Sequence, residues 1–232
     1  MDIEGTTSPI DFVYQVLFPF VRAHLKDYLR RNAGSEELQR DLSRLRDEHL
    51  KDLAPPQWLD EPLDAHIESV MRYVFWLMDH DRKSTGLKSL QGRVWQEGYD
   101  GGQLKSQVFP DVPDALRYWK SKKLDVRIFS SGSVLAQKLL FANTEVGDLA
   151  HFLCGYFDTN IGPKTDPESY CQIANEYHLP ASEVVFISDM TAELDAAKRA
   201  GMQTLLCVRP GNLPQPEKHG HSVIYSFREI VW

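Results

Sequence analysis

Residues 124–141 read Leu-Asp-Val-Arg-Ile-Phe-Ser-Ser-Gly-Ser-Val-Leu-Ala-Gln-Lys-Leu-Leu-Phe, and this stretch decides the fold class. Residues 124–129 form a short β-branched and apolar run, which is typical of a strand. Four small polar residues follow, and residues 134–141 then return to a helical pattern. The order of strand, polar turn and helix is the repeating unit of parallel α/β sheets.

The same alternation continues toward the C-terminus. The pattern predicts a strand at 184–187, an alanine-rich helix at 191–200, a strand at 204–208 and a weak strand near 223–224. Together these segments predict an α/β fold with a parallel sheet. Ligands of such sheets bind at the carboxyl ends of the strands. The loops that begin at Ser130, Asp189 and Arg209 are therefore the candidate site.

The stretch between residues 11 and 99 has a different texture, because apolar residues recur there at helical spacing. Pro19 is predicted to break or restart the first helix. Ser35, followed by two glutamates, is a typical helix start. No convincing strand is visible, so this part is predicted to be a helical bundle.

Composition narrows the class of protein. The net charge of −7 disfavours a nucleic-acid or anionic-membrane partner, although a local positive site could still bind a small phosphate ester. No apolar run approaches the ~20 residues of a membrane span, and no signal peptide is visible. The cysteines are Cys154, Cys171 and Cys207. They form no C-x-x-C pair, so we expect buried, reduced thiols in a cytoplasmic protein.

The first seven residues, Met-Asp-Ile-Glu-Gly-Thr-Thr, carry two acids two positions apart. If Asp2 ends a strand, Glu4 returns to the same side of the backbone. Gly5 would let the chain turn away, and Thr6 could cap the helix that follows. Only Met1 precedes Asp2, whereas a buried strand usually needs about 5 residues. We therefore expect unpaired backbone groups on the two neighbouring strands.

Three further polar groups suit one reaction. The segment from Ser130 to Ser133 is either an anion site at a helix start or an ordinary capped turn. Asp189, with Glu193 and Asp195 behind it, is either a site for a hard cation or an acidic helix cap. Lys164 lies in a loop and could neutralise a phosphate or simply be solvated.

Two other groups have both a structural and a functional interpretation. Arg209 follows a predicted strand, and it either approaches the site or forms a structural ion pair. His219 and His221 look like metal ligands, but they lie in a Pro/Lys/Gly-rich loop without an acidic neighbour in the sequence.

The order Asp-x-Glu-Gly-Thr, strand-Ser, Lys, strand-Asp resembles the four motifs of the haloacid dehalogenase (HAD) phosphohydrolase superfamily. Within this superfamily, Glu4 and several short sequence motifs resemble the enolase-phosphatase (acireductone synthase) family. The motifs are Thr6-Thr7-Ser8-Pro9, Val16-Leu17-Phe18-Pro19, Ser130-Ser131-Gly132-Ser133, Phe157-Asp158-Thr159 and Val208-Arg209-Pro210-Gly211-Asn212. The resemblance implies a HAD-like Rossmannoid parallel sheet core (residues 1–11 and 108–232) with an inserted all-helical cap (residues 12–107).

The resemblance also implies a role for each candidate residue. Asp2 would be the nucleophile that forms an aspartyl-phosphate, and Glu4 the acid/base partner. Ser130 and Ser131 would hold the phosphoryl group or other substrate oxygens, and Lys164 would offset negative charge. One Mg²⁺ per chain would be held by Asp2, Glu4 and Asp189. The roles of Glu193 and Asp195 would be to support these groups.

The implied reaction is that of methionine salvage. The family converts 2,3-diketo-5-methylthiopentyl-1-phosphate to the acireductone 1,2-dihydroxy-3-keto-5-methylthiopentene and phosphate, by enolisation and then dephosphorylation. Either Glu4 or a cap residue could be the enolisation base. The resemblance further implies a monomer. Two alternatives stay open, namely a HAD phosphatase for another small phosphate ester, and an inactive HAD-fold binding protein that lacks the first strand.

Overall fold

The chain forms two compact units in a computed structural model that describes residues 1–82 and 84–231. One unit comprises Met1–Gln15 and Leu104–Trp232, and the other comprises Val16–Gln103. The second unit is thus inserted into the chain of the first. The roles expected for the two units, catalytic core and cap, stay predictions.

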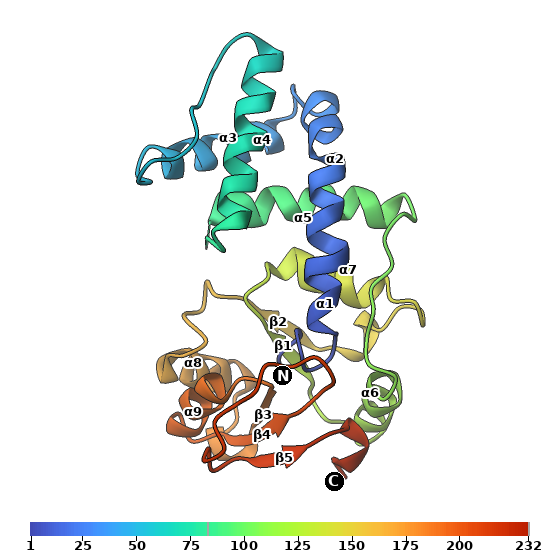
Figure 1. Ribbon diagram of the computed structural model, residues 1–232. Helices are drawn as coiled ribbons and strands as arrows, with labels where there is room; N and C mark the ends of the chain where they lie inside the picture. Colours follow the sequence, from blue (N-terminus) through green and yellow to red (C-terminus); the bar gives the residue numbers. More distant parts are fainter. Residues whose placement is uncertain (83, 232) are drawn as a thin grey trace. The chain divides into compact units, whose positions relative to one another are not determined.

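The first unit is built around parallel strands (Figure 1). Its described residues form β1 (Arg127–Phe129), β2 (Gly155–Phe157), β3 (Val185–Ser188), β4 (Gln203–Cys207) and β5 (Ser222–Ile224). β1 pairs with β2, and β4 lies between β3 and β5, always in parallel register. The strands predicted near β1, β3, β4 and β5 are confirmed. β2 was not predicted, because its three residues include a glycine and no β-branched side chain.

Residues Met1 and Asp2 join the two ladders. The Met1 nitrogen donates to the Arg127 carbonyl at 2.9 Å, and the Phe129 N–H donates to the Met1 carbonyl at 2.9 Å. On the other side, the Asp2 N–H donates to the Ile187 carbonyl at 2.9 Å. The expectation of unpaired groups on the neighbouring strands is therefore wrong at these positions, because two residues suffice to reach both neighbours.

Helices cover the strands of the first unit. They are α1 (Ile10–Phe12), α6 (Val112–Ser121), α7 (Val134–Ala142), α8 (Pro167–Tyr177) and α9 (Thr191–Arg199), with short 3₁₀ turns at Ala150–Phe152, Ala181–Glu183 and Phe227–Glu229. α9 packs on β3 and β4, and α8 packs on α9 (Figure 1). Tyr170, Phe186 and Leu194 are buried between these elements with Phe129 and Leu206. This apolar cluster fixes the positions at which the strands end.

All regular elements among the described residues of the second unit (16–82 and 84–103) are helices joined by loops, and none is a strand, as predicted. It contains α2 (Phe18–Arg31), α3 (Glu36–His49), α4 (Leu63–Asp79) and α5 (Thr85–Asp100). A π-helical turn, Val13–Leu17, leads into α2, and Pro19 lies in the first turn of that helix, so the predicted restart at Pro19 is confirmed. The Ser35 side chain accepts a hydrogen bond from the Leu38 N–H and caps α3, as predicted.

The cysteines only partly follow expectation. All three are free thiols, but Cys154 is exposed, Cys171 is half-buried and only Cys207 is buried. The expectation of burial is wrong for Cys154, which lies just before the start of β2. No helix among residues 1–82 and 84–231 is long and apolar enough to cross a membrane.

Candidate active site

The chain leaves the sheet at Asp2 and enters a tight turn, here called the N-terminal loop (residues 2–8). The Ile3 carbonyl accepts hydrogen bonds from the N–H groups of Thr6, Thr7 and Ser8, at 3.1, 2.8 and 2.9 Å. Gly5 has φ +70°, a left-handed conformation that favours glycine. The sharp turn predicted at Gly5 is thus confirmed.

The helix cap predicted at Thr6 is wrong. The Thr6 hydroxyl is buried and has no hydrogen-bond partner among the described residues. α1 begins after Pro9, without a side-chain cap. The reason is local, because Thr6 is fully buried in the turn and lies three residues ahead of the helix boundary.

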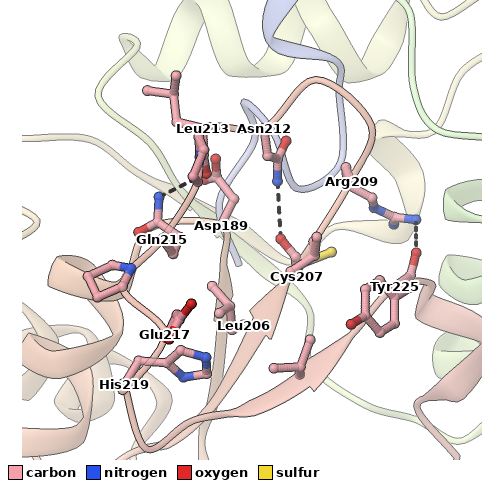
Figure 2. A pocket seen from close by; sticks show the side chains of 14 residues that line it. Asp189, Leu206, Cys207, Arg209, Asn212, Leu213, Gln215, Glu217, His219 and Tyr225 are labelled. Carbon is pink, nitrogen blue, oxygen red and sulfur yellow. Dashed lines mark hydrogen bonds between the residues drawn. The ribbon is translucent and has the colours of Figure 1, made fainter.

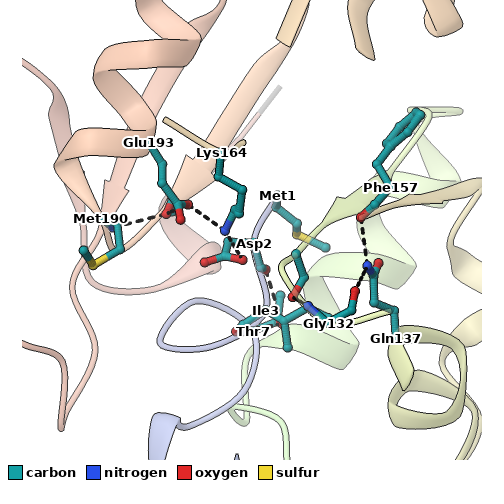
Figure 3. A network of polar contacts seen from close by, with 12 residues as sticks. Met1, Asp2, Ile3, Thr7, Gly132, Gln137, Phe157, Lys164, Met190 and Glu193 are labelled. Atoms are coloured by element: carbon teal, nitrogen blue, oxygen red, sulfur yellow. Dashed lines mark hydrogen bonds and ion pairs between the residues drawn. The ribbon is translucent and has the colours of Figure 1, made fainter. Parts of the chain in front are cut away.

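Lys164 joins two carboxylates at the centre of the site (Figure 3). Its Nζ lies 2.6 Å from Asp2 Oδ1 and 2.7 Å from Glu193 Oε2. All three side chains are largely buried, with 9%, 6% and 14% exposure for Lys164, Asp2 and Glu193. The Tyr170 hydroxyl holds the lysine backbone by donating to the Lys164 carbonyl at 2.7 Å. Lys164 is therefore a fixed internal cation rather than a solvated loop side chain.

The net effect of burial and the neighbouring charges is to raise the pKa values of both Lys164 and Glu193. Burial by itself lowers the pKa of the Lys164 ammonium, but the charges of Asp2 and Glu193 raise it overall above its ordinary value. Burial raises the pKa of the Glu193 carboxyl, and the nearby charge of Asp2 adds to that rise. Lys164 thus stays protonated in a site that is rich in carboxylates.

Asp189 is the third carboxylate and lies against Gly5. A Cβ atom built on Gly5 would stand only 2.4 Å from Asp189 Oδ2. Burial raises the pKa of Asp189 to about 7, and the charges of Asp2 and Glu193 contribute to the rise. No salt bridge reaches Asp189 from the described residues. One lysine cannot neutralise three carboxylates, so the site carries an excess of negative charge.

The sheet topology explains why these residues meet. Asp2 follows Met1, which pairs with β1, and Ser130 follows Phe129, the last residue of β1. Asp189 follows Ser188, the last residue of β3, on the other side of Asp2. Because the strands are parallel, all three residues leave the sheet at one edge.

The Ser130 loop (residues 130–133) is held from several sides. Ser130 is 1% exposed, and its hydroxyl accepts a hydrogen bond from the Gly132 N–H at 3.2 Å. The Gln137 amide donates to the Gly132 and Phe157 carbonyls, each at 2.8 Å (Figure 3). Ser131 is half-buried, and Ser133 caps α7. The loop is therefore both a capped turn and a rigid edge beside Asp2.

The structure separates the two acids that follow Asp189. Glu193 belongs to the site, because it contacts Lys164 and accepts a hydrogen bond from the Ser188 hydroxyl at 2.9 Å. Asp195 does not belong to it, since its side chain is 58% exposed and pairs with His221 at 3.2 Å. Helical periodicity explains the difference, as Glu193 stands one turn after Asp189 and Asp195 points elsewhere.

Arg209 forms the structural ion pair that was one of its two interpretations. Its Nη1 lies 2.9 Å from Asp111 Oδ2, and its Nε donates to the Thr6 carbonyl at 3.2 Å. The guanidinium lies between the rings of Phe109 and Phe227, at 4.6 and 4.7 Å from the ring centroids. Arg209 thus supports the N-terminal loop through its hydrogen bond to the Thr6 carbonyl.

Glu4 lies in the N-terminal loop and is half-buried. Its proposed catalytic and metal-binding roles stay predictions.

The carboxylates suit a magnesium ion rather than a closed metal cage. Among residues 1–82 and 84–231, no group of three or more His, Cys, Asp or Glu side chains is arranged to hold a metal. The rings of His219 and His221 stack on each other, and the His221 ring forms a hydrogen bond with the Thr204 hydroxyl. Mg²⁺, however, usually binds one or two carboxylates and keeps several waters. Asp2 and Asp189 are two carboxylates at one edge of the sheet, and their metal-binding role stays a prediction.

Comparisons with known proteins agree with this geometry. A family model described as haloacid dehalogenase-like hydrolase matches residues 26–201. A Synechococcus elongatus protein named Enolase-phosphatase E1 is 47% identical, over 99% of this chain and 95% of that protein. A Pseudomonas aeruginosa protein of the same name is 45% identical, over 99% of this chain and 96% of that protein. The chain belongs to the enolase-phosphatase E1 family of haloacid dehalogenase-like hydrolases.

A solved structure matches the fold of this chain over nearly its whole length. The UTR4 protein from Saccharomyces cerevisiae matches with a TM-score of 0.79 at 35% identity, covering 99% of this chain and 97% of that one. The HAD-like α/β fold expected from the sequence is therefore confirmed.

A pocket of about 270 Å³ lies beside Asp189 in this enolase-phosphatase (Figure 2). Its wall includes Asn212, whose side-chain nitrogen donates to the Gly5 carbonyl at 3.0 Å and the Cys207 carbonyl at 3.2 Å. Sequence reasoning gave neither Asn212 nor Gln137 a role at the site. An uncharged amide in a loop or a helix carries no charge pattern or spacing that would have marked it.

Proposed function

We propose that the protein converts 2,3-diketo-5-methylthiopentyl-1-phosphate into the acireductone 1,2-dihydroxy-3-keto-5-methylthiopentene and phosphate in methionine salvage. The dicarbonyl is first enolised, and the phosphate ester is then hydrolysed. Relatives that carry the name Enolase-phosphatase E1 share 45–47% of their residues with this chain over nearly its whole length. The observation that carries the proposal is the buried Asp2 carboxylate, fixed by Lys164 at the carboxyl edge of the sheet.

Asp2 and Glu4 divide the phosphatase chemistry between them. An Asp2 carboxylate oxygen attacks phosphorus while the bond from phosphorus to the enol oxygen breaks, which gives an aspartyl-phosphate. Glu4 donates a proton to the leaving oxygen. Glu4 then takes a proton from a water molecule, which attacks phosphorus, releases phosphate and restores Asp2.

Lys164 and the Ser130 loop position the phosphoryl group. The Lys164 ammonium holds Asp2 in place and offsets negative charge that would otherwise repel the phosphate. Ser130 and Ser131 offer hydroxyl and backbone N–H donors at the same edge of the sheet. Phosphoryl transfer needs mainly such positioning and charge neutralisation, so these groups supply what the chemistry requires.

Asp2 and Asp189 would bind one Mg²⁺ per chain through their carboxylates, and Glu4, from the same loop as Asp2, would contribute to that metal site. HAD-like phosphatases generally use this ion, and the excess of carboxylates around Asp189 favours a divalent cation. When bound, Mg²⁺ supplies positive charge that stabilises the phosphoryl oxygens and the enolate. The enolisation base is either Glu4 or a residue of the helical unit.

The deciding assay follows phosphate release and the absorbance of the enol with the diketo phosphate and Mg²⁺. We expect the enol to form and phosphate to appear with it, and sugar phosphates to react far more slowly. Equal turnover of sugar phosphates would instead make the protein a general HAD phosphatase. No turnover by the folded protein would favour the inactive binding protein.

We also infer that the protein works as a cytoplasmic monomer. Its three free thiols and the moderate net charge of −7 suit a reducing compartment and a small-molecule substrate. Light scattering of the purified protein tests the monomer, and two chains per particle would contradict it.

A further inference from the structure

Asn212 stands at the point where the N-terminal loop meets Asp189. Its side-chain nitrogen donates two hydrogen bonds, to the Gly5 carbonyl at 3.0 Å and to the Cys207 carbonyl at 3.2 Å. Figure 2 shows the bond to Cys207. Because both partners are carbonyl oxygens, only the NH₂ group of the amide can face them. The orientation of the amide is therefore fixed, and its oxygen must point the other way.

That oxygen lies beside Gly5, as the Asp189 carboxylate does. A Cβ atom built on Gly5 would stand 2.9 Å from Asn212 Oδ1 and 2.4 Å from Asp189 Oδ2, so both oxygens lie beside the same point. Asn212 Oδ1 is buried and accepts no hydrogen bond from the described residues. Two oxygen acceptors thus border the same buried position, and no salt bridge of the described residues reaches Asp189.

A buried hydrogen-bond acceptor without a donor destabilises the folded protein, and a negatively charged neighbour increases that cost. A cation held at Asp189, together with the water molecules it keeps, would offset the negative charge and give the Asn212 oxygen a partner. Arg209 makes a useful contrast, since it also holds the N-terminal loop, through the Thr6 carbonyl, but its charge is already paired with Asp111.

We propose that Asn212 is a positioning residue of the divalent-cation site: its NH₂ group holds the N-terminal loop and its oxygen stabilises the cation bound at Asp189. The proposal rests on the proposed function, because it assumes that a divalent cation binds there. Outer-shell partners of this kind typically change metal affinity by about 10–100-fold when they are replaced.

The test measures Mn²⁺ binding by calorimetry, without substrate, in the full-length protein and three variants. Asn212→Ala removes both functions of the amide and should weaken Mn²⁺ binding about 10-fold or more. Asn212→Asp keeps an oxygen toward Asp189 but loses the donors. It should bind Mn²⁺ within about threefold of the unchanged protein, or tighter, while its melting temperature falls.

Ser8→Ala is the matched control. It removes another hydrogen bond of the same loop, from the Ser8 hydroxyl to the Gln107 carbonyl at 2.7 Å. We expect it to lower the melting temperature and to leave Mn²⁺ affinity within about twofold.

Three results would overturn the proposal: unchanged affinity in Asn212→Ala, equal weakening in Ser8→Ala, or binding by Asn212→Asp as weak as by Asn212→Ala. If the unchanged protein binds no Mn²⁺, the metal requirement of the proposed function fails as well. Normal binding by that protein together with unchanged binding by Asn212→Ala removes only the role of Asn212.

Discussion

Replacing Gly5 by alanine tests the packing of the N-terminal loop against Asp189. The new Cβ would lie 2.4 Å from Asp189 Oδ2, 2.7 Å from Asp189 Cγ and 2.9 Å from Asn212 Oδ1. The backbone there has φ +70°, which costs a residue with a side chain about 1–3 kcal/mol. Overpacking of a filled site adds about 1–3 kcal/mol. Gly5→Ala should therefore lose about 2–6 kcal/mol of unfolding free energy, a large part of the 5–15 kcal/mol typical of a domain.

The protein can reduce this cost by moving the Asp189 carboxylate, which makes the shortest contact, and the Asn212 amide away. Mg²⁺ binding should then fall, so urea unfolding is measured with and without Mg²⁺. Gly102→Ala is the matched control, because Gly102 has φ +69° but no atom within 4 Å of its added Cβ. It should lose only the backbone part, about 1–3 kcal/mol, and keep the stabilisation by Mg²⁺. Equal losses in the two variants, with equal Mg²⁺ effects, would refute the contact between Gly5 and Asp189.

Three further predictions concern charge. Lys164→Met leaves buried carboxylates unpaired and should lower the free energy of unfolding, measured in urea, by about 3–5 kcal/mol at pH 7 and by less at pH 5. An equal loss at both pH values would contradict the pairing. Burial raises the pKa of Asp189 to about 7, so without metal the folded protein binds a proton that the unfolded chain releases near pH 4. Stability should therefore fall as the pH rises from about 4 to 7, and Asp189→Asn should flatten that slope in pH-dependent melts. Asp111→Ala breaks the buried pair with Arg209 and should lower the free energy of unfolding, measured in urea, by about 3–5 kcal/mol. Asp114→Ala, three residues on in α6 and 59% exposed, should lower it by less than about 1 kcal/mol.

The parallel fold and its polar edge could be predicted because their signals are local. Asp189 and Ser130 each follow a short apolar run directly, and parallel pairing carries such strand ends to one edge. Glu193 needed only the helical period to be placed one turn beyond Asp189. Each of these inferences relates residues that are separated along the chain by less than the length of one helix or strand.

The remaining features depend on contacts between distant segments. Met1 completes the sheet through hydrogen bonds to residues more than a hundred positions away, which no local pattern reveals. The sequence left two interpretations of Arg209 open, and the ion pair became visible only when the fold brought Asp111 beside it. Asn212 and Gln137 are neutral amides, and the backbone carbonyls that accept their hydrogen bonds come close only in the folded chain.

The central claim is that Asp2 takes the phosphoryl group from the diketo phosphate. The most direct measurement compares phosphate release by the protein and by Asp2→Asn, at saturating Mg²⁺ and with both proteins shown to be folded. Asn keeps the size of the side chain but lacks the anionic oxygen that must attack phosphorus. We predict release by the unchanged protein and none above the uncatalysed rate for Asp2→Asn. Release at a comparable rate by Asp2→Asn would contradict the account.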